Sequence, residues 1–248
     1  MRLNKYISSC GVCSRREADK LIAEGRILVN GLVPSPGQDV SEADKVCLDG
    51  KEITAKSERI YLVYYKPLGV VCTTRDAHAK KTVIEDIGFS ERVTYAGRLD
   101  RDSEGLLIMT DDGDLIQAMM KGSNKHEKEY EVTVDKDING DFLNRMSHGV
   151  YLQELDRTTR PCTVTRTGKR SFNIILTQGL NRQIRRMCHE LGFEVVSLKR
   201  TRVMCVELKN HKIKAGEYEP LTAEEIATLY RDTKLGEKNG NRRDKKGV

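Results

Sequence analysis

The chain has 248 residues, of which 38% are hydrophobic and 32% charged, and its formal net charge is +6. This composition is polar for a globular protein, but it supplies enough apolar residues to exclude a disordered chain. No apolar run approaches the roughly 18 residues that a membrane span requires, and the first residues show no secretory signal. The seven scattered cysteines are typical of reduced thiols, so we expect a cytoplasmic protein. The mild basic excess is compatible with a polyanionic partner.

Residues 1–55 are predicted to form a small unit of two helices followed by short strands. Ser14 is a candidate N-cap, with Glu17 at the third position of a capping box. Gly25 is typical of the end of that helix, and residues 27–29 favour a short strand.

Residues 56–230 are predicted to form a larger α+β domain with a mostly antiparallel central sheet flanked by helices, because strand patterns outnumber helical ones and do not alternate with them. Strands are expected at 59–65, 70–74, 106–110, 128–134 and 172–176. A basic helix is expected over 181–191, and Gly192 would end it. Residues 231–248 are basic and poor in apolar side chains. They are predicted to be a disordered tail, either merely solvated or a weak phosphate-binding arm.

Arg98 and Asp100 lie two residues apart between Gly97 and Gly105, just before an apolar strand. Residues at this spacing on an extended segment point the same way, so both side chains are candidates for one cleft. A charged surface loop is the simpler interpretation of so short a motif.

Residues 179–202 carry a high density of basic side chains on the predicted helix and on the strand after it. Such density favours a phosphate-binding surface over a solvated helix face, because few acidic residues interleave. Tyr130, on an alternating strand, is a candidate for base stacking or an ordinary sheet residue. Cys10 and Cys13 have the spacing of half a zinc site, but no second pair follows, so no metal site is expected.

These segments occur in an order that resembles one family of RNA-modifying enzymes. The matching motifs are Tyr65-Lys66-Pro67-Leu68-Gly69, Gly97-Arg98-Leu99-Asp100, Lys128-Glu129-Tyr130 and the run 179–188. Over about residues 1–230 the chain resembles the RsuA/RluB/RluE/RluF family of ribosomal RNA pseudouridine synthases. The run 179–188 is most similar to the RluF branch, which acts on 23S rRNA. Residues 1–50 resemble the RNA-binding module shared with ribosomal protein S-four.

The resemblance implies that a uridine in folded RNA is converted to pseudouridine without a cofactor or a metal. By this match Asp100 is the nucleophile, which attacks either the anomeric carbon of the ribose or carbon 6 of the uracil. Arg185 would pair with Asp100 and orient it. Tyr130 would stack on the base and assist proton transfer, and Ile184 would supply an apolar wall.

The resemblance also assigns residues to RNA binding. Arg98 would enter the space that the uridine leaves when it flips out, because a stacked base hides its reacting carbons. Lys66 and Arg182 are expected to contact phosphates. The N-terminal module would hold RNA through five basic side chains, Arg2, Lys5, Arg15, Arg16 and Arg26. The expected partner is ribosomal RNA, with transfer RNA as a second candidate, and the protein is expected to be a monomer.

Two other classes of protein fit parts of this pattern. A non-catalytic RNA-binding or ribosome-assembly protein would share the basic residues but would not need Asp100. A carboxylate-based hydrolase could use Asp100 and Asp102 as an acid pair, but it would not explain the basic segment or the N-terminal module. Loss of activity in Asp100→Ala with RNA binding retained would single out the synthase.

Overall fold

The computed structural model describes residues 1–56, 58–73 and 81–235. The chain divides into two compact units. The first unit contains Met1–Ile60 together with the short segments Phe89–Thr94 and Thr110–Gly113, and the second contains the rest. The polar segment after residue 55 belongs to the first unit, where Arg59 donates a hydrogen bond of 3.1 Å to the Ser9 carbonyl. The boundary thus lies about five residues later than the sequence suggested.

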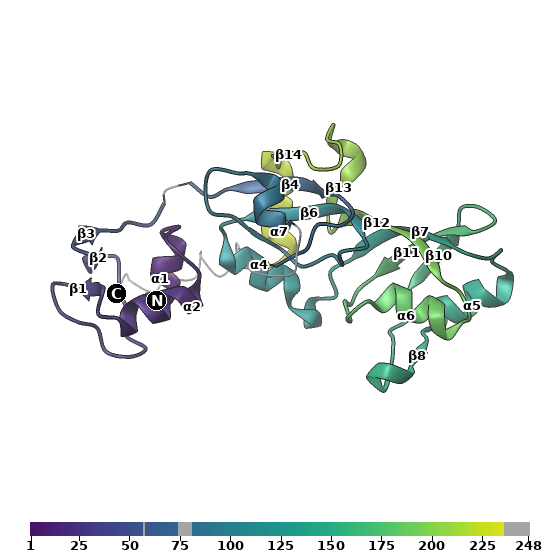
Figure 1. Ribbon diagram of the computed structural model, residues 1–248, viewed down its shortest axis with the longest axis horizontal. Coiled ribbons are helices and arrows are strands. Elements are labelled where there is room, and N and C mark those ends of the chain that lie inside the picture. Colours follow the sequence, from purple (N-terminus) through teal and green to yellow (C-terminus); the bar gives the residue numbers. More distant parts are fainter. Residues whose placement is uncertain (57, 74–80, 236–248) are drawn as a thin grey trace, which may run out of the picture. The chain divides into compact units, whose positions relative to one another are not determined.

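The first unit combines two helices with a three-stranded antiparallel sheet (Figure 1). Its elements are α1 (Leu3–Ser9), α2 (Arg15–Ala23), β1 (Ile27–Val29), β2 (Val46–Leu48) and β3 (Lys51–Glu52). The Ser14 side chain accepts a hydrogen bond of 3.2 Å from the Glu17 amide, as expected for the N-cap of α2. One apolar face of each helix packs with the sheet, and the core contains Leu3, Ile7, Ala18, Ile27, Val29 and Val46.

The second unit is built on a large central sheet, which confirms the α+β class. Its strand order is β10-β11-β7-β12-β6-β4-β14, and β13 and β5 pair with β12 and β6. β12 is antiparallel to β7 but parallel to β6. The strands are β4 (Tyr61–Lys66), β5 (Thr94–Tyr95), β6 (Glu104–Thr110), β7 (Lys128–Val134), β10 (Thr163–Arg166), β11 (Ser171–Leu176), β12 (Val195–Val203), β13 (Val206–Glu207) and β14 (Tyr218–Pro220).

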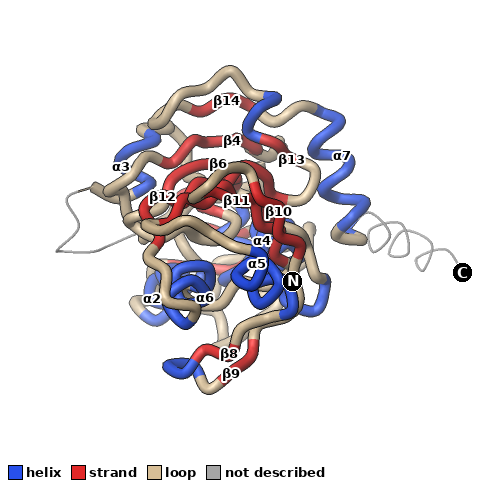
Figure 2. Tube along the Cα trace, turned by 90° about the vertical axis from the view of Figure 1, so that its right-hand side faces the viewer, coloured by secondary structure: helices blue, strands red, loops and turns tan. Residues whose placement is uncertain are grey.

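The elements outside the central sheet are α3 (Val83–Ile87), α4 (Gly113–Met120), α5 (Gly140–His148), β8 (Tyr151–Leu152), β9 (Arg157–Thr158), α6 (Gln183–Glu190), α7 (Ala223–Asp232) and three 3-10 turns at Gly122–Asn124, Gln153–Leu155 and Leu208–Asn210. Helices α4, α5 and α6 lie on one side of the sheet, with the small β8–β9 hairpin beyond α6 (Figures 1 and 2).

Two apolar clusters fill the second unit, one for each half of the sheet. The first joins β7 and β11 to α5 and α6, and it contains Val132, Phe142, Phe172, Ile174, Ile184 and Met187. The second joins β4 and β6 to α4 and α7, and it contains Val63, Leu106, Ile108, Leu115, Met119 and Leu229. The division places α4 and α6 on different cores.

Gly105 allows β6 and β12 to approach each other closely. Its φ is +109°, and an added Cβ would lie 2.3 Å from the Arg200 carbonyl oxygen. Only glycine fits this position without displacement of backbone. The parallel pair at the middle of the sheet therefore depends on this residue.

Two further sequence expectations differ from the structure. Residues 70–73 form no regular strand; Val71 makes a single bridge to Thr82, and residue 74 lies outside the described residues. The basic tail does not begin at 231, because α7 continues to Asp232. The hydroxyl of Thr233, which is buried, donates a hydrogen bond of 2.6 Å to the Leu229 carbonyl. Residues 236–248 of the expected tail lie outside the described residues. In the described part of the chain, no helix combines the length and apolarity that crossing a membrane requires.

Candidate active site

A cleft of about 680 Å³ lies in the second unit between the end of α4 and the beginning of α6. Five of the residues singled out from the sequence line it, namely Arg98, Asp100, Tyr130, Arg182 and Ile184. They come from three segments that are remote in the sequence: the loop before β6, strand β7 and the start of α6. The cleft has a carboxylate, an aromatic ring, an apolar wall and guanidinium groups along one space.

Asp100 is the first residue of a tight turn, in which the Ser103 amide donates a hydrogen bond of 3.1 Å to the Asp100 carbonyl. Its side chain is 31% exposed. The turn releases the chain into β6 and holds the carboxylate at the cleft wall. A carboxylate in this setting is accessible to a ligand while its backbone is fixed.

Lys66 supports this turn from behind. The side chain is fully buried, and its ammonium donates hydrogen bonds of 2.7 Å to the Ser103 carbonyl and of 2.9 Å to the Pro67 carbonyl. Burial lowers the pKa of Lys66, and Cys72 and Asp100 act in the opposite direction. The expectation that Lys66 contacts phosphate is therefore wrong, because a side chain without exposed surface cannot reach the RNA backbone.

Other hydrogen bonds tie the same loop to its surroundings. The Gly69 amide donates a hydrogen bond of 2.8 Å to the Arg101 carbonyl, and the Leu99 amide donates one of 3.4 Å to the Cys72 sulfur. The buried Arg200 donates from Nη1 to the Arg98 carbonyl at 3.3 Å. The loop that carries Asp100 is thus held from both sides.

Arg182 and Arg185 both engage Asp102, the neighbour of the candidate nucleophile. Arg182 forms a bidentate pair with Asp102 at 3.0 and 2.8 Å, and Arg185 Nε lies 3.2 Å from an Asp102 carboxylate oxygen. Arg182 approaches Asp100 only to 4.0 Å. The expected Arg185–Asp100 pair is therefore replaced by Arg185–Asp102, since Asp102 at the turn projects toward α6.

The two guanidinium groups determine the charge state of Asp102. The hydrogen bonds from Arg182 lower the pKa of the Asp102 carboxyl, and the charge of Arg185 lowers it further. A carboxylate held in this way is a poor general acid, which argues against Asp100 and Asp102 acting as the acid pair of a hydrolase.

The backbone at the start of α6 directs Arg182 toward this turn. Arg182 is the N-cap of the helix and has a left-handed conformation with φ +50°. A non-glycine residue in this region costs free energy and must be held by its surroundings. Here Gln183 Oε1 accepts a hydrogen bond of 3.1 Å from the Leu180 amide, and this bond fixes the loop just before Arg182.

Tyr130 and Ile184 form the less polar part of the cleft. Tyr130 is half-buried on β7, and Ile184 on the first turn of α6 is 4% exposed. Arg98 is exposed at the rim. A planar base entering this space would find a ring, an aliphatic wall and a carboxylate within one cleft.

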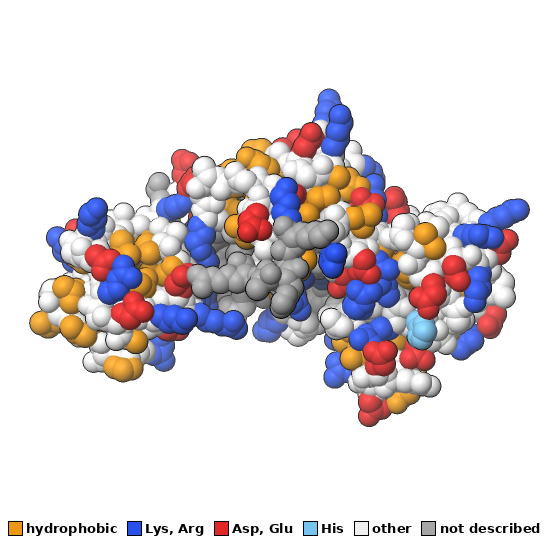
Figure 3. All heavy atoms as spheres, viewed as in Figure 1, with side chains coloured by type: hydrophobic (Ala, Val, Ile, Leu, Met, Phe, Trp, Pro, Cys, Tyr) orange, Lys and Arg blue, Asp and Glu red, His pale blue; other side chains and the backbone are white. Residues whose placement is uncertain are grey.

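The cations of the 179–202 segment are largely matched by acids from elsewhere in the chain. Arg186 pairs with Glu154, and Arg202 pairs with Glu127 at 2.9 Å and with Glu129 at 3.0 Å. Basic and acidic side chains are accordingly intermixed over α6 and its surroundings (Figure 3). The outer part of α6 is less electropositive than its sequence predicts.

The N-terminal cations differ in their availability. Arg15 and Arg16 are exposed on the first turn of α2, and Lys5 is half-buried on α1. Arg2 donates to the Gly37 carbonyl, and Arg26 forms a bidentate pair with Asp49 at 2.9 and 2.5 Å. Arg15 and Arg16 are therefore the more accessible candidates for phosphate contacts.

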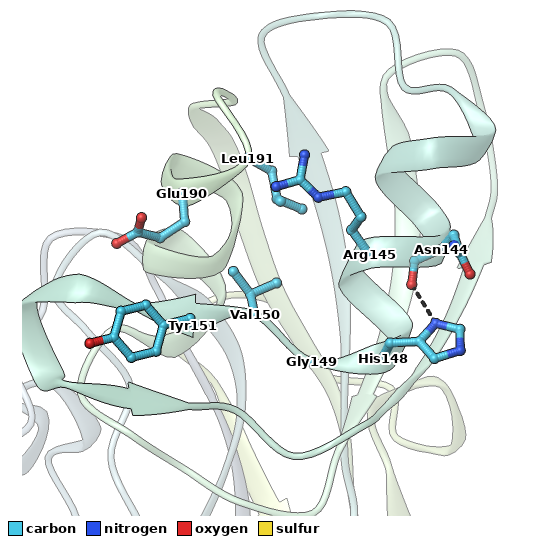
Figure 4. A pocket seen from close by; sticks show the side chains of 8 residues that line it. All are labelled: Asn144, Arg145, His148, Gly149, Val150, Tyr151, Glu190 and Leu191. Carbon is cyan, nitrogen blue, oxygen red and sulfur yellow. Dashed lines mark hydrogen bonds between the residues drawn. The ribbon is translucent and has the colours of Figure 1, made fainter.

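A second pocket, of about 350 Å³, lies between the ends of α5 and α6 (Figure 4). His148 turns its ring to the Asn144 carbonyl at 2.8 Å, and the polar side chains of Arg145, Tyr151 and Glu190 also line the pocket. None of the residues singled out for catalysis lines this pocket. Among the described residues no group of His, Cys, Asp and Glu is arranged to hold a metal ion.

The sequence did not single out three polar side chains that also line the cleft, His126, Gln178 and Arg200. Arg200 was counted among the surface cations, yet it is 1% exposed. Lys128 was quoted only as part of a motif, but it too faces the cleft. Alternation with Tyr130 along β7 was the one signal that could have placed Lys128 there.

The second unit has a mixed sheet that presents a carboxylate turn, a tyrosine and an arginine helix to one cleft, and the chain adds a small helix-and-strand unit. This combination is typical of an enzyme that modifies nucleic acid. The RNA pseudouridylate synthase family matches residues 60–190, and the S4 domain matches residues 1–46. The chain belongs to the RNA pseudouridine synthases, which are isomerases, and carries an S4 domain at its N-terminus.

Individual relatives agree with this assignment. The Escherichia coli K12 dual-specificity RNA pseudouridine synthase RluF is 42% identical over 93% of this chain and 79% of its own length. An uncharacterized RNA pseudouridine synthase of Aquifex aeolicus is 37% identical over 96% of this chain and 100% of its own. A pseudouridylate synthase crystal structure matches with a TM-score of 0.68 and 28% identity, covering 92% of this chain and 99% of that one.

Proposed function

We propose that this protein isomerises a specific uridine of ribosomal RNA, most simply of 23S rRNA, to pseudouridine, with Asp100 as the nucleophile. A transfer RNA is a second candidate substrate. The similarity to a relative named as a dual-specificity RNA pseudouridine synthase supports this substrate class.

One observation carries the choice of nucleophile. Of the two carboxylates on the turn, Asp102 holds both arginines of α6, whereas Asp100 faces the cleft and lies 4.0 Å from Arg182. A carboxylate that is not covered by a bidentate partner is free to form a covalent bond. Asp102 then acts as a positioning residue for Arg182 and Arg185.

The reaction needs a nucleophile that can also leave. In one route Asp100 bonds to the anomeric carbon as the glycosidic bond to the ring nitrogen breaks. The uracil turns, carbon 5 displaces Asp100 from the anomeric carbon, and carbon 5 then loses its proton. In the other route Asp100 adds to carbon 6 of the uracil, and the glycosidic bond to the ring nitrogen then breaks. The uracil turns, carbon 5 bonds to the anomeric carbon, and Asp100 leaves carbon 6 as the proton of carbon 5 is lost. Tyr130 stacks on the base and assists this proton transfer, and Ile184 packs against it.

The target base must leave its stack before Asp100 can reach it. Arg98, exposed at the cleft rim, fills the space that the flipped uridine leaves. The module of residues 1–55 grips the RNA electrostatically, chiefly through Arg15 and Arg16, so that affinity falls as salt rises.

The test compares cells that lack this protein and are supplied with wild type or Asp100→Ala. Pseudouridine is mapped chemically along 23S rRNA, 16S rRNA and transfer RNA, and RNA binding of the purified variant is measured in parallel. We expect one uridine to lose its modification in the deletion and to regain it only with wild type. Restoration by Asp100→Ala, or unchanged modification at every site, would favour a non-catalytic RNA-binding protein instead.

A further inference from the structure

One face of β7 continues the cleft beyond Tyr130. Tyr130 and Lys128 alternate on this strand and so point to the same side, and His126 lies two residues further back. β11 is antiparallel to β7 with Leu176 opposite Lys128, and Gln178 follows two residues beyond the end of β11. All of these residues line the cleft. The cleft therefore has three polar side chains beyond the tyrosine, one on β7 and two just outside the paired strands.

Several polar atoms in this part of the cleft are buried without hydrogen-bond partners in the described structure. Nε2 of His126, Nε2 of Gln178 and Nη2 of Arg200 have no exposed surface and no hydrogen bond. Lys128 Nζ makes one long contact of 3.4 Å, to the His126 carbonyl. Buried polar groups are normally satisfied, and those in a cleft that are not mark the place of a ligand.

The charges around Lys128 are unbalanced. Burial lowers the pKa of Lys128 to about 8, and the charge of Arg200 on β12 lowers it further. Burial and Lys128 also lower the pKa of His126, against Asp232 of α7 and a hydrogen bond to the Ala118 backbone. A neutral imidazole has one acceptor nitrogen, and Nε2 of His126, which has no partner, is available for this role.

The resulting pattern of donors and acceptors is complementary to one ligand edge. Lys128 and Gln178 supply hydrogen-bond donors, and His126 supplies an acceptor. The edge of uracil has two carbonyl acceptors with an N–H donor between them. Residues two apart on a strand are separated by about 6.6 Å, so a base stacked on Tyr130 brings its edge within reach of Lys128.

We propose that Lys128, His126 and Gln178 bind the edge of the flipped uracil, and that Lys128 is the cation that stabilises the negative charge the base acquires during the reaction. This inference rests on the proposed function. It adds a catalytic residue that does not depend on which carbon Asp100 attacks.

The role of Lys128 is the same in either route. If Asp100 attacks the anomeric carbon, the bonding pair stays on the departing ring nitrogen and spreads to the two carbonyl oxygens. If Asp100 adds to carbon 6, the electrons of the ring double bond move to the carbonyl at carbon 4. In both cases the Lys128 ammonium donates a hydrogen bond to a carbonyl oxygen that has gained charge, and no proton is transferred.

The experiment compares Lys128→Met, Lys128→Arg and the control Lys169→Met, which removes an exposed lysine from the β10–β11 hairpin, outside the cleft. Tritium release from RNA labelled at carbon 5 of uridine gives the single-turnover rate at saturating enzyme, and a filter assay gives the RNA affinity. We expect Lys128→Met to lower the rate about 100-fold with its Kd within about threefold. Lys128→Arg should recover about tenfold of that loss, because it restores the cation, and Lys169→Met should match wild type.

Four outcomes overturn the inference. A rate for Lys128→Met within about threefold of wild type removes Lys128 from the reaction, and a loss of affinity at unchanged rate assigns it to a phosphate instead. If Lys128→Met does not fold, the rate of wild type is measured on RNA that carries 4-thiouridine or 2-thiouridine at the target position. Equal rates for uridine and both thio-bases overturn the proposal. Wild type that releases no tritium from any of the three RNAs refutes the proposed function, and the subsite with it.

Discussion

Replacing Lys128 by methionine should stabilise the protein, although the cleft loses a functional group. The lysine is half-buried, and its ammonium makes only one long hydrogen bond among the described residues. A pKa that falls from 10.5 to about 8 on folding corresponds to roughly 3 kcal/mol of free energy. Methionine has a similar length and keeps the packing, so we expect a gain of about 1–3 kcal/mol at pH 7.

The pH dependence gives the sign of this effect. Between about pH 8 and 10.5 the unfolded chain binds a proton at Lys128 that the folded protein does not, so the stability of wild type rises with pH in this window. The advantage of Lys128→Met should therefore be largest below pH 8 and should vanish near pH 10.5. Urea unfolding at pH 7 and pH 10 measures it, with Lys169→Met expected to lie within about 0.5 kcal/mol of wild type. A variant that is less stable than wild type at pH 7 would refute this account of Lys128.

Three further variants address other parts of the molecule. Lys66→Met removes the two hydrogen bonds behind the Asp100 turn, and we expect a rate about 10–100-fold lower with RNA affinity unchanged, measured by tritium release. Gly105→Ala forces a Cβ to 2.3 Å from the Arg200 carbonyl, and we expect a loss of about 3 kcal/mol or more in urea unfolding. Arg15→Ala should lower the slope of log affinity against log salt by about 0.7–0.9, while the paired Arg26→Ala should change it less.

Each of these expectations has a result that contradicts it. A normal rate for Lys66→Met would mean that the turn holds its shape without the buried ammonium. Unfolding of Gly105→Ala at the wild-type urea midpoint would mean that β6 and β12 can separate at no cost. A larger change in salt slope for Arg26→Ala than for Arg15→Ala would mean that RNA displaces Asp49 from Arg26.

Local patterns were sufficient for many elements of the fold. The alternation over 128–134 predicted β7 with its observed bounds, and Ser14 caps α2 as expected. These signals depend on neighbours within a few residues, and such neighbours are visible in the sequence. The α+β class followed from the order of the same signals.

The partners of the charged residues could not be predicted in the same way. The sequence showed few acids within a helical turn of the α6 arginines, but Asp102 and Glu154 reach them from segments remote in the chain. Lys66 and Arg200 were counted as surface cations because nothing adjacent to them marks burial. Which of two aspartates binds an arginine depends on the direction of a turn, and that direction is fixed only by tertiary contacts.

The parallel pair between β6 and β12 is a short junction at the centre of the sheet. Lys199 lies opposite Glu104 and Arg200 opposite Gly105, whereas β12 follows β7 from Val195 to Val203. α4 and α6 belong to different cores, so the distance between them is set across this short junction. The width of the cleft therefore depends on the pairing of β6 with β12, and not on the packing within either core alone.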